Sequence, residues 1–277
     1  MIIDIATWIL NASQVLRNVS SSPHLDAELI MSLATQKSRE KLLVDGNKRL
    51  STMQLARANY YLHLRKHLIP IAYITHHKKF YGLNFYVNKH VLIPRPETEN
   101  LVQMALDHAK TLKQPPVILD LGCGSGCIGL SLKHALADTN ASFILADISS
   151  QALKIAKKNA KRFKLNDVKF VKSNLLKKID LSEIDILCAN LPYVDRAWDF
   201  ITANTKHEPK LALFARKNGL ELIEKTLKQI STRPHKKHLA VFLEADPLQM
   251  EDIEKMVLKL FRGAKIKVSG FTMQILL

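Results

Sequence analysis

The segment Asn190-Leu191-Pro192-Tyr193 places hydrogen-bond acceptors beside an aromatic ring within four residues. It follows residues 184–189, a short apolar run typical of a buried strand. The side-chain oxygen of Asn190 and the carbonyl of Leu191 can both accept N–H bonds from one planar nitrogen. Pro192 stiffens the turn, and the Tyr193 ring offers a face to the planar group. We therefore expect Asn190, Leu191, Pro192 and Tyr193 to form a catalytic site that orients an amide or aromatic amine nitrogen.

A nitrogen oriented in this way suits the transfer of a methyl group from a sulfonium. Such a nitrogen is a poor nucleophile, because its lone pair is delocalised. Acceptors that draw both hydrogens to one side favour a tetrahedral nitrogen and stabilise the charge that develops on it. In-line displacement also requires aligned atoms and the exclusion of water. The alternative interpretation is an ordinary turn in which the tyrosine packs against the core. A cofactor site upstream favours the catalytic interpretation over this one.

A glycine-rich turn follows the apolar run 117–121. Glycine lets the backbone approach a ligand closely and adopt dihedral angles barred to other residues. The turn departs from the dinucleotide fingerprint, because Ile128 precedes Gly129 where the fingerprint has its last glycine. A plain strand-to-helix turn is the competing interpretation. We expect the turn to bind a nucleotide-like cofactor through Gly122, Cys123, Gly124, Ser125 and Gly126.

Polar residues also stand at or just after the ends of the next two predicted strands. Asp147 stands where an acid can accept both ribose hydroxyls of a nucleoside, with capping of the helix that starts near Ser149 as its alternative role. Asn174 and Leu175 follow the third strand and are suited to hold adenine by its edge and face. The carboxyl ends of parallel strands meet in one crevice. We expect S-adenosylmethionine there, bound by the turn together with Asp147, Asn174, Leu175 and Asn190.

The composition indicates a folded chain from a reducing compartment. With 277 residues, 47% of them hydrophobic, it can bury a sizeable core. Three cysteines form no even disulfide framework, and no histidine cluster completes a zinc site, so we expect no metal. The N-terminus carries Asp4 where a secretory signal carries Lys or Arg, and no apolar run suits a membrane helix. A cytoplasmic protein without a membrane partner is expected.

The formal net charge of +16 leaves two interpretations open. It can reflect a solvated, lysine-rich surface, or attraction to RNA or the ribosome. Few aromatic residues interleave with the cations, so a stacking platform for single-stranded nucleic acid is not indicated. One helix face concentrates the charge through Lys154, Lys157, Lys158, Lys161, Arg162 and Lys164.

Residues 1–75 are predicted to form an all-helical domain. Ser51 or Thr52 is expected to cap a helix over 55–68 that Pro70 ends. Apolar spacing predicts the core-facing residues of two earlier helices as Leu10, Val15, Leu16, Leu25, Leu29, Ile30, Leu33 and Ala34.

The pattern changes to period two over residues 76–93, which predicts a β-hairpin that links two domains. From there, residues 94–277 are predicted to form the catalytic domain. Alternating strands and helices require a parallel sheet covered on both faces, and residues 265–277 suggest a terminal hairpin. Strands are expected over 117–121, 143–147, 168–172, 184–189 and 239–245, and helices over 126–137, 150–163, 218–230 and 247–261.

Several motifs together resemble the PrmC/HemK family of protein-(glutamine-N5) methyltransferases, over essentially the whole chain. The most specific is Pro94-Arg95-Pro96-Glu97-Thr98-Glu99 within the motif 92–99, which generic methyltransferases lack. The chain departs from the family at Leu191, where a proline is usual, and at Asn174, where an acid is common. The other motifs are Pro70-Ile71-Ala72-Tyr73-Ile74, Phe80-Tyr81-Gly82-Leu83-Asn84-Phe85, Asp120 to Gly126, Ala146-Asp147-Ile148-Ser149 and Glu208 to Leu213.

This resemblance implies an α/β fold, namely a Rossmann-like class I S-adenosylmethionine-dependent methyltransferase domain preceded by a small all-helical domain and a linking β-hairpin. It implies methylation of the glutamine amide nitrogen in the Gly-Gly-Gln motif of peptide chain release factors. Residues 1–75 would recognise that substrate protein, with the ribosome as a further candidate contact and a monomer as the expected state. The loop 194–208 has no assigned role.

Two rival functions stay in view. Asn190-Leu191-Pro192-Tyr193 also resembles the rRNA adenine N6 dimethyltransferases, which the positive charge would suit. Those enzymes place their helical domain after the catalytic one and lack the segment 93–99. A binding module with a vestigial cofactor pocket is the other rival, and the intact glycine turn argues against it.

Overall fold

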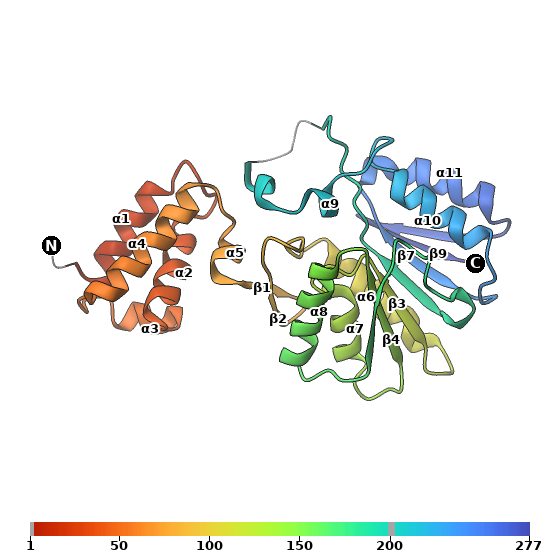
Figure 1. Cartoon of the computed structure of the whole chain (residues 1–277), viewed down its shortest axis with the longest axis horizontal. Coiled ribbons are helices and arrows are strands. Elements are labelled where there is room, and N and C mark those ends of the chain that lie inside the picture. The colour runs from red at the N-terminus through yellow and green to blue at the C-terminus, as the bar shows by residue number, and fades with distance from the viewer. Residues whose placement is uncertain (1–2, 199–202) are drawn as a thin grey trace. The chain divides into compact units, whose positions relative to one another are not determined.

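The computed structural model describes residues 3–198 and 203–277 (Figure 1). It divides into two compact units. The first comprises the chain up to His77, together with the short 3-10 helix Ala203–His207. The second comprises the rest, from Lys78 onward. Within the first unit, His207 contacts the backbone carbonyl of His67 through its Nε2 atom, at 3.1 Å.

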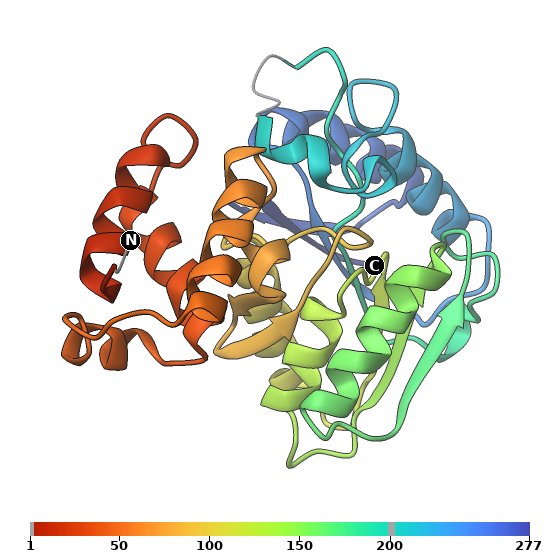
Figure 2. The same cartoon turned by 60° about the vertical axis from the view of Figure 1, so that its left-hand side comes forward.

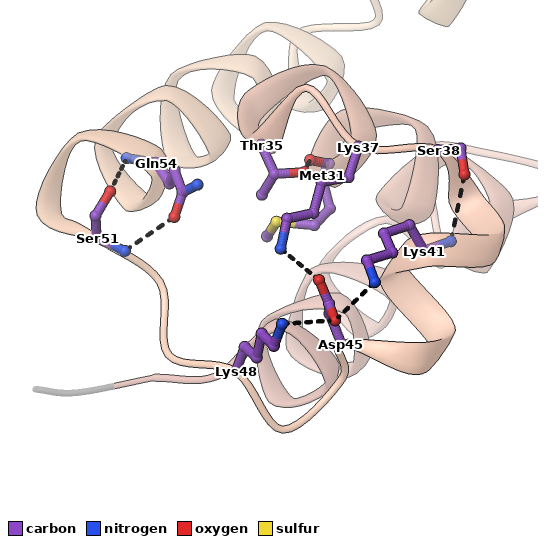
Figure 3. Close-up of polar contacts among 9 residues, drawn as sticks. All are labelled: Met31, Thr35, Lys37, Ser38, Lys41, Asp45, Lys48, Ser51 and Gln54. Atoms are coloured by element: carbon purple, nitrogen blue, oxygen red, sulfur yellow. Dashed lines mark hydrogen bonds and ion pairs between the residues drawn. The ribbon is translucent and has the colours of Figure 1, made fainter.

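Helices make up the first unit. Ser51 caps α4, because its hydroxyl accepts from the Gln54 amide while the Gln54 side chain accepts from the Ser51 amide (Figure 3). The side chain of Arg65 donates to Asp26 at 2.7 Å and ties α4 to α2 in the interior. The helices are α1 (Ile5–Val15), α2 (Pro23–Thr35), α3 (Arg39–Val44), α4 (Thr52–Lys66) and α5 (Ile71–Thr75).

The buried face of α1 differs from the one predicted. Leu10 and Val15 are 56% and 45% exposed, and Leu25 of α2 is exposed as well. The true core face repeats at helical spacing and is centred on Trp8, whose Nε1 donates to Asn59 at 2.9 Å. The prediction was wrong for Leu10 and Val15, because apolar spacing alone does not show which neighbouring helices cover a face, whereas Leu16 is buried as predicted. The buried residues on this face are Ile5, Trp8, Ile9, Ala12 and Leu16.

A two-stranded hairpin, β1 (His77–Phe80) and β2 (Leu83–Tyr86), occupies the segment predicted as a linker. Its turn residues Tyr81 and Gly82 both have positive φ, at 46° and 75°, as a tight hairpin turn requires. Phe80 and Phe85 are buried and meet edge to face, with ring centroids 6.1 Å apart.

The second unit is built on a seven-stranded sheet in the order β5-β4-β3-β6-β7-β9-β8. The strands from β5 to β7 are parallel, and β9 runs antiparallel to both of its neighbours. This arrangement confirms the predicted α/β fold class. The strands are β3 (Val117–Leu121), β4 (Ser142–Asp147), β5 (Val168–Lys172), β6 (Ile186–Ala189), β7 (Ala240–Glu244), β8 (Lys265–Ser269) and β9 (Thr272–Leu276).

Helices cover both faces of this sheet, α6, α7 and α8 on one side and α10 and α11 on the other (Figures 1 and 2). The central strands are buried along their length, which explains their near-continuous apolar sequences. In the described part of the chain, no helix is long and apolar enough to cross a membrane. The helices are α6 (Thr98–Thr111), α7 (Cys127–Ala135), α8 (Ser150–Arg162), α9 (Lys210–Leu213), α10 (Glu221–Ser231) and α11 (Met250–Leu260).

One carboxylate organises the end of α3 in the first unit. Asp45 is 3% exposed and takes the ammonium groups of Lys37 at 2.6 Å and Lys48 at 2.9 Å, with Lys41 at 3.7 Å (Figure 3). Hydrogen bonds from Lys37 and Lys48 lower the pKa of Asp45 to about 2. The Asp45 carboxylate is therefore charged in the folded protein at neutral pH.

Asp45→Asn should weaken the first unit at neutral pH, because three ammonium groups lose their shared carboxylate. Since the folded pKa is depressed from 3.8, this contribution is complete above pH 4 and is lost as the pH falls through about 2. Urea unfolding followed by Trp8 fluorescence in a Trp198→Phe background reports on this unit. We expect a lower urea midpoint for Asp45→Asn than for the parent protein at pH 7, and a difference between the two midpoints that narrows towards pH 2. Equal midpoints at pH 7 would contradict the stabilising role of Asp45.

Candidate functional site

A cavity lies at the edge of the sheet where β3, β4, β5 and β6 end. Each of these strand ends contributes lining residues, as expected for an open α/β sheet. From the predicted site, ten residues line it: Gly122, Cys123, Gly124, Ser125, Asp147, Asn174, Leu175, Asn190, Leu191 and Pro192. Gly126 and Tyr193 do not line it.

The glycine turn depends on left-handed backbone at three positions, with φ of 74° at Gly122, 53° at Gly124 and 81° at Gly126. A Cβ atom at Gly122 would lie 3.0 Å from the Leu191 side chain, so glycine lets the turn approach the Asn190 motif. A Cβ at Gly126 would lie 2.9 Å from Leu130. Gly126 thus shapes the start of α7 beneath the cavity.

Gly129 supplies the close helix packing that the dinucleotide fingerprint assigns to its last glycine. A Cβ there would lie 2.7 Å from Leu145 and 3.0 Å from Asp120. Its amide donates to the Asp120 carboxylate at 2.8 Å. Burial raises the pKa of Asp120 to about 7, and Asp120 lies outside the cavity lining. Asp120 therefore contacts the first turn of α7.

Asp147 ties the turn to the second strand. Its two carboxylate oxygens accept from the amides of Gly124 at 2.9 Å and Ser149 at 2.8 Å. Ser149, rather than Asp147, caps α8 through the Ala152 amide. Asp147 is 9% exposed, and burial raises its pKa. Its carboxylate thus combines a structural role with a place on the cavity wall.

The residues after β5 form a compact turn. The Ser173 hydroxyl donates to the Leu175 carbonyl at 2.7 Å and accepts from the Lys178 amide at 3.1 Å. Leu175 has a φ of 50°, in the left-handed region that a tight turn uses. Asn174 is exposed at the cavity, where its amide is accessible.

Asn190 lies in a hydrogen-bond network that the sequence did not reveal. Its Nδ2 donates to the Glu244 carboxylate at 2.8 Å and to the Thr98 hydroxyl at 3.1 Å. The Tyr193 hydroxyl donates to the same Glu244 oxygen at 3.2 Å, and the Tyr193 ring packs against the core. Burial and the neighbouring Glu244 raise the pKa of Tyr193. The Tyr193 ring thus contacts the core rather than the cavity, and its catalytic role stays a prediction.

The turn after Asn190 is held by a side chain that follows β7, the neighbouring parallel strand. Gln249 donates through its side chain to the carbonyls of Tyr193 at 3.0 Å and Asn218 at 2.6 Å. Gly219 makes room for this contact, because a Cβ there would lie 1.9 Å from the Tyr193 carbonyl oxygen. The backbone of the segment 190–193 is therefore held at its last residue, Tyr193.

Two segments far apart in the sequence meet at the cavity. Glu208, which is buried, accepts from Arg95 at 2.5 Å and from the amide of Ile93 at 3.0 Å. This pairing joins the motif 93–99 to the motif 208–213 within the second unit. Both motifs line the cavity, through Pro94, Arg95, Thr98, Pro209, Leu211 and Ala212.

The three cysteines are free thiols, and burial raises the pKa of Cys127 to about 12. Cys123 and Cys127 line the cavity, while Cys188 is buried in β6. Within the residues that the structure describes, no group of three or more His, Cys, Asp or Glu side chains could hold a metal ion. The thiols thus act as small apolar side chains.

Two family models match the chain. Residues 7–75 match the PrmC N-terminal domain and residues 112–258 a methyltransferase domain. A release factor glutamine methyltransferase from Buchnera aphidicola is 37% identical, over 81% of this chain and 80% of that protein. One from Borreliella burgdorferi is 35% identical, over 90% and 87%. A bifunctional methyltransferase from Rickettsia prowazekii is 35% identical over 90% of this chain, which spans 51% of that longer protein.

Solved structures match at the level of the fold. The catalytic domain of human Mettl16, solved with an RNA hairpin, gives a TM-score of 0.53 at 18% identity, over 80% of each chain. The 16S rRNA N2 G1207 methyltransferase from Thermus thermophilus, solved with AdoMet and guanosine, also gives 0.53, at 15% identity over 72% of this chain and 49% of that one.

Proposed function

This chain belongs to the family of release factor glutamine methyltransferases, and we propose that it methylates the side-chain amide nitrogen of the Gly-Gly-Gln glutamine in peptide chain release factors. Family membership confirms the resemblance read from the sequence. The observation that carries the proposal is the convergence of the glycine turn, Asp147 and Asn190 on one cavity. Such a cavity can hold a nucleoside and a planar amide next to each other.

The proposed cofactor is S-adenosylmethionine, which when bound supplies a methyl group on a positively charged sulfonium. Asp147 supports this assignment, since its carboxylate lines the cavity and forms no ion pair with any described residue. A buried carboxylate without a cation needs hydrogen-bond donors, and ribose hydroxyls provide them. We assign adenine to Asn174 and Leu175, and the space beside the glycine turn to the rest of the cofactor.

Asn190 and Leu191 are the proposed acceptors for the glutamine amide. Both N–H groups of the Asn190 side chain are bonded to Thr98 and Glu244, so its Oδ1 is the atom that remains for the substrate. With the Leu191 carbonyl it can bind both hydrogens of the amide and stabilise the charge that develops on the nitrogen. Pro192 keeps the two acceptors in a fixed relation. No strong base is needed, because the positively charged nitrogen formed by methylation is acidic and loses its proton readily.

The first unit is proposed to recognise the release factor, and the enzyme is proposed to act as a cytoplasmic monomer. Its match to the PrmC N-terminal domain supports this role. All three cysteines are free, which suits a reducing compartment. All described residues that line the cavity belong to the second unit, so binding of the large substrate is separable from binding of the cofactor.

An rRNA adenine methyltransferase is the second candidate, and the charge of α8 is the observation that favours it. None of the exposed cations on α8 forms an ion pair with a described residue. On α10 and α11, by contrast, lysines pair with glutamates one turn away, as Lys225 does with Glu221 at 2.6 Å. Contact between α8 and RNA, including the ribosome, fits this contrast.

Asp147→Ala should weaken S-adenosylmethionine binding about tenfold or more, because a charge-assisted hydrogen bond contributes about 1.5–3 kcal/mol. The loss includes the carboxylate's support of the Gly124 amide. Titration calorimetry measures the effect, with Asp120→Asn as the control for an acid that lies outside the cavity. A dissociation constant unchanged by Asp147→Ala would remove Asp147 from the cofactor site.

Asn190→Ala should leave cofactor binding largely intact while transfer falls by about a hundredfold, the usual scale for a lost transition-state partner. Mass spectrometry of a release factor incubated with the protein and S-adenosylmethionine should show one added methyl on the Gly-Gly-Gln glutamine. A release factor with alanine at that position is the matched control.

Two outcomes would oppose this function. Equal losses in binding and turnover would make Asn190 a cofactor ligand only. Methylation of rRNA in the same assay, with no methyl on the release factor, would promote the adenine methyltransferase.

Removal of residues 1–75 should abolish transfer to an intact release factor and leave cofactor binding measurable. The reason is that, in the part of the chain that the structure describes, the residues lining the cavity all come from the second unit. Cofactor titration of the truncated chain establishes that its cavity is formed before activity is compared. Transfer at the full-length rate would exclude residues 1–75 from substrate recognition.

A further inference from the structure

A buried acid stands beside the proposed catalytic amide. We infer that Glu244 is a positioning residue for methyl transfer, which holds the Asn190 side chain so that Oδ1 faces the substrate nitrogen. The inference rests on the proposed function and assigns a role to a residue outside every motif of the sequence. Glu244 touches neither substrate nor cofactor in this account and acts through Asn190.

The register of the sheet brings the two residues together. β6 and β7 are parallel neighbours, with Ala189 paired to Leu243. The next residues along the two strands are Asn190 and Glu244, which therefore lie side by side at the carboxyl edge. Glu244 is 1% exposed, and its Oε1 lies 2.8 Å from the Asn190 Nδ2 atom. The contact is thus built into the backbone pairing rather than made by a mobile surface side chain.

Hydrogen-bond accounting shows what this contact decides. An asparagine amide has two N–H donors and one acceptor oxygen, and its two flipped orientations have almost the same shape. The hydroxyl of Thr98 lies 3.1 Å from Nδ2 and accepts one of the two amide hydrogens. An ionised carboxylate has no hydrogen to donate, so it can only accept hydrogen bonds. Glu244 therefore excludes the orientation in which Oδ1 of Asn190 would face it, because two acceptors would then oppose each other.

The excluded orientation is also the inactive one. It would present the Asn190 N–H group to the cavity, where the substrate amide offers N–H groups of its own. The orientation set by Glu244 presents an acceptor instead. A charged acceptor on the Nδ2 side also polarises the amide and makes Oδ1 a stronger acceptor as positive charge develops on the substrate nitrogen.

The carboxylate itself is held in place by its neighbours. The Tyr193 hydroxyl donates to the same Oε1 atom at 3.2 Å, whereas Oε2 has no hydrogen-bond partner among the described residues. Burial and the nearby Glu97 raise the pKa of Glu244 to about 7, against hydrogen bonds from Thr98, Tyr193 and Asn190. A proton on Oε2 would remove the charge and leave Oε1 as the acceptor. Glu244→Gln reproduces that neutral state.

Three variants of the full-length protein test the role. Glu244→Leu removes the acceptor at similar size, and kcat should fall about a hundredfold, as for loss of the oriented acceptor itself. Glu244→Gln keeps an acceptor and should retain kcat within about tenfold, since orientation survives and only the charge is lost. Thr272→Val is the matched control. Thr272 of β9 is the strand-pairing partner of Glu244 on β7, and the buried Thr272 hydroxyl has no hydrogen-bond partner among the described residues.

A positioning role predicts that only kcat changes. The dissociation constant of S-adenosylmethionine and the KM for the release factor should stay within about threefold in all three variants. Thr272→Val should keep the full kcat. If Glu244→Leu lowers cofactor affinity and kcat together, Glu244 supports the fold of the site and the inference is overturned.

The double variant Asn190→Ala/Glu244→Leu isolates the path of the effect. If Glu244 acts through Asn190, the double variant should be no slower than Asn190→Ala, within about twofold, because coupled residues do not add. Additive losses would show that Glu244 acts without Asn190 and would overturn the inference.

A measurement without turnover separates this inference from the proposed function. In ¹⁵N-labelled protein, the Asn190 side-chain amide signal is identified by its loss in Asn190→Ala. We expect this signal to move, and its hydrogens to exchange faster with solvent, in Glu244→Leu but not in Thr272→Val. An unmoved signal would overturn the inference. A parent protein that methylates no release factor would refute the proposed function and leave the amide measurement valid.

Discussion

Parallel pairing of β3, β4, β5 and β6 is the constraint on which the site depends. It brings strand ends from four separate parts of the sequence to one edge, where each continues into a turn that lines the cavity. The amides of Gly122 and Cys123 both donate to the Ala146 carbonyl, so the glycine turn is an extension of the sheet. Because the register is fixed by buried apolar strands, the sheet brings the functional side chains to one edge, where hydrogen bonds such as that between Asn190 and Glu244 orient them.

The sequence predicted the parts of the site that depend on local chemistry. Glycines that need positive φ, an acid after the second strand and an amide after the fourth each lie where a parallel sheet places them. The α/β fold class is confirmed, and the predicted strands differ from the observed ones by only one or two residues at their ends. Apolar runs and turn residues are local signals, so a single sequence was sufficient to find them.

Long-range partners were missed because no local signal marks them. Glu244 ends an apolar strand and reads as part of it, although a buried acid at the end of a strand beside the Asn190 motif could have drawn attention to it. Arg95 and Glu208 stand far apart in the sequence, and only the fold shows that they pair. The face of α1 was assigned from apolar spacing, and Leu10 and Val15 are exposed. Their environment depends on which helices pack together, which spacing alone does not determine.

The central claim is that the Asn190 side chain and the Leu191 backbone bind the glutamine amide beside the cofactor. A crystal structure of the protein with S-adenosylhomocysteine and a Gly-Gly-Gln peptide measures this directly. The account predicts that Asn190 Oδ1 and the Leu191 carbonyl oxygen both lie within hydrogen-bond distance, about 2.7–3.2 Å, of the glutamine nitrogen. A glutamine amide bound elsewhere in the cavity, or an Asn190 Oδ1 turned towards Glu244, would contradict it.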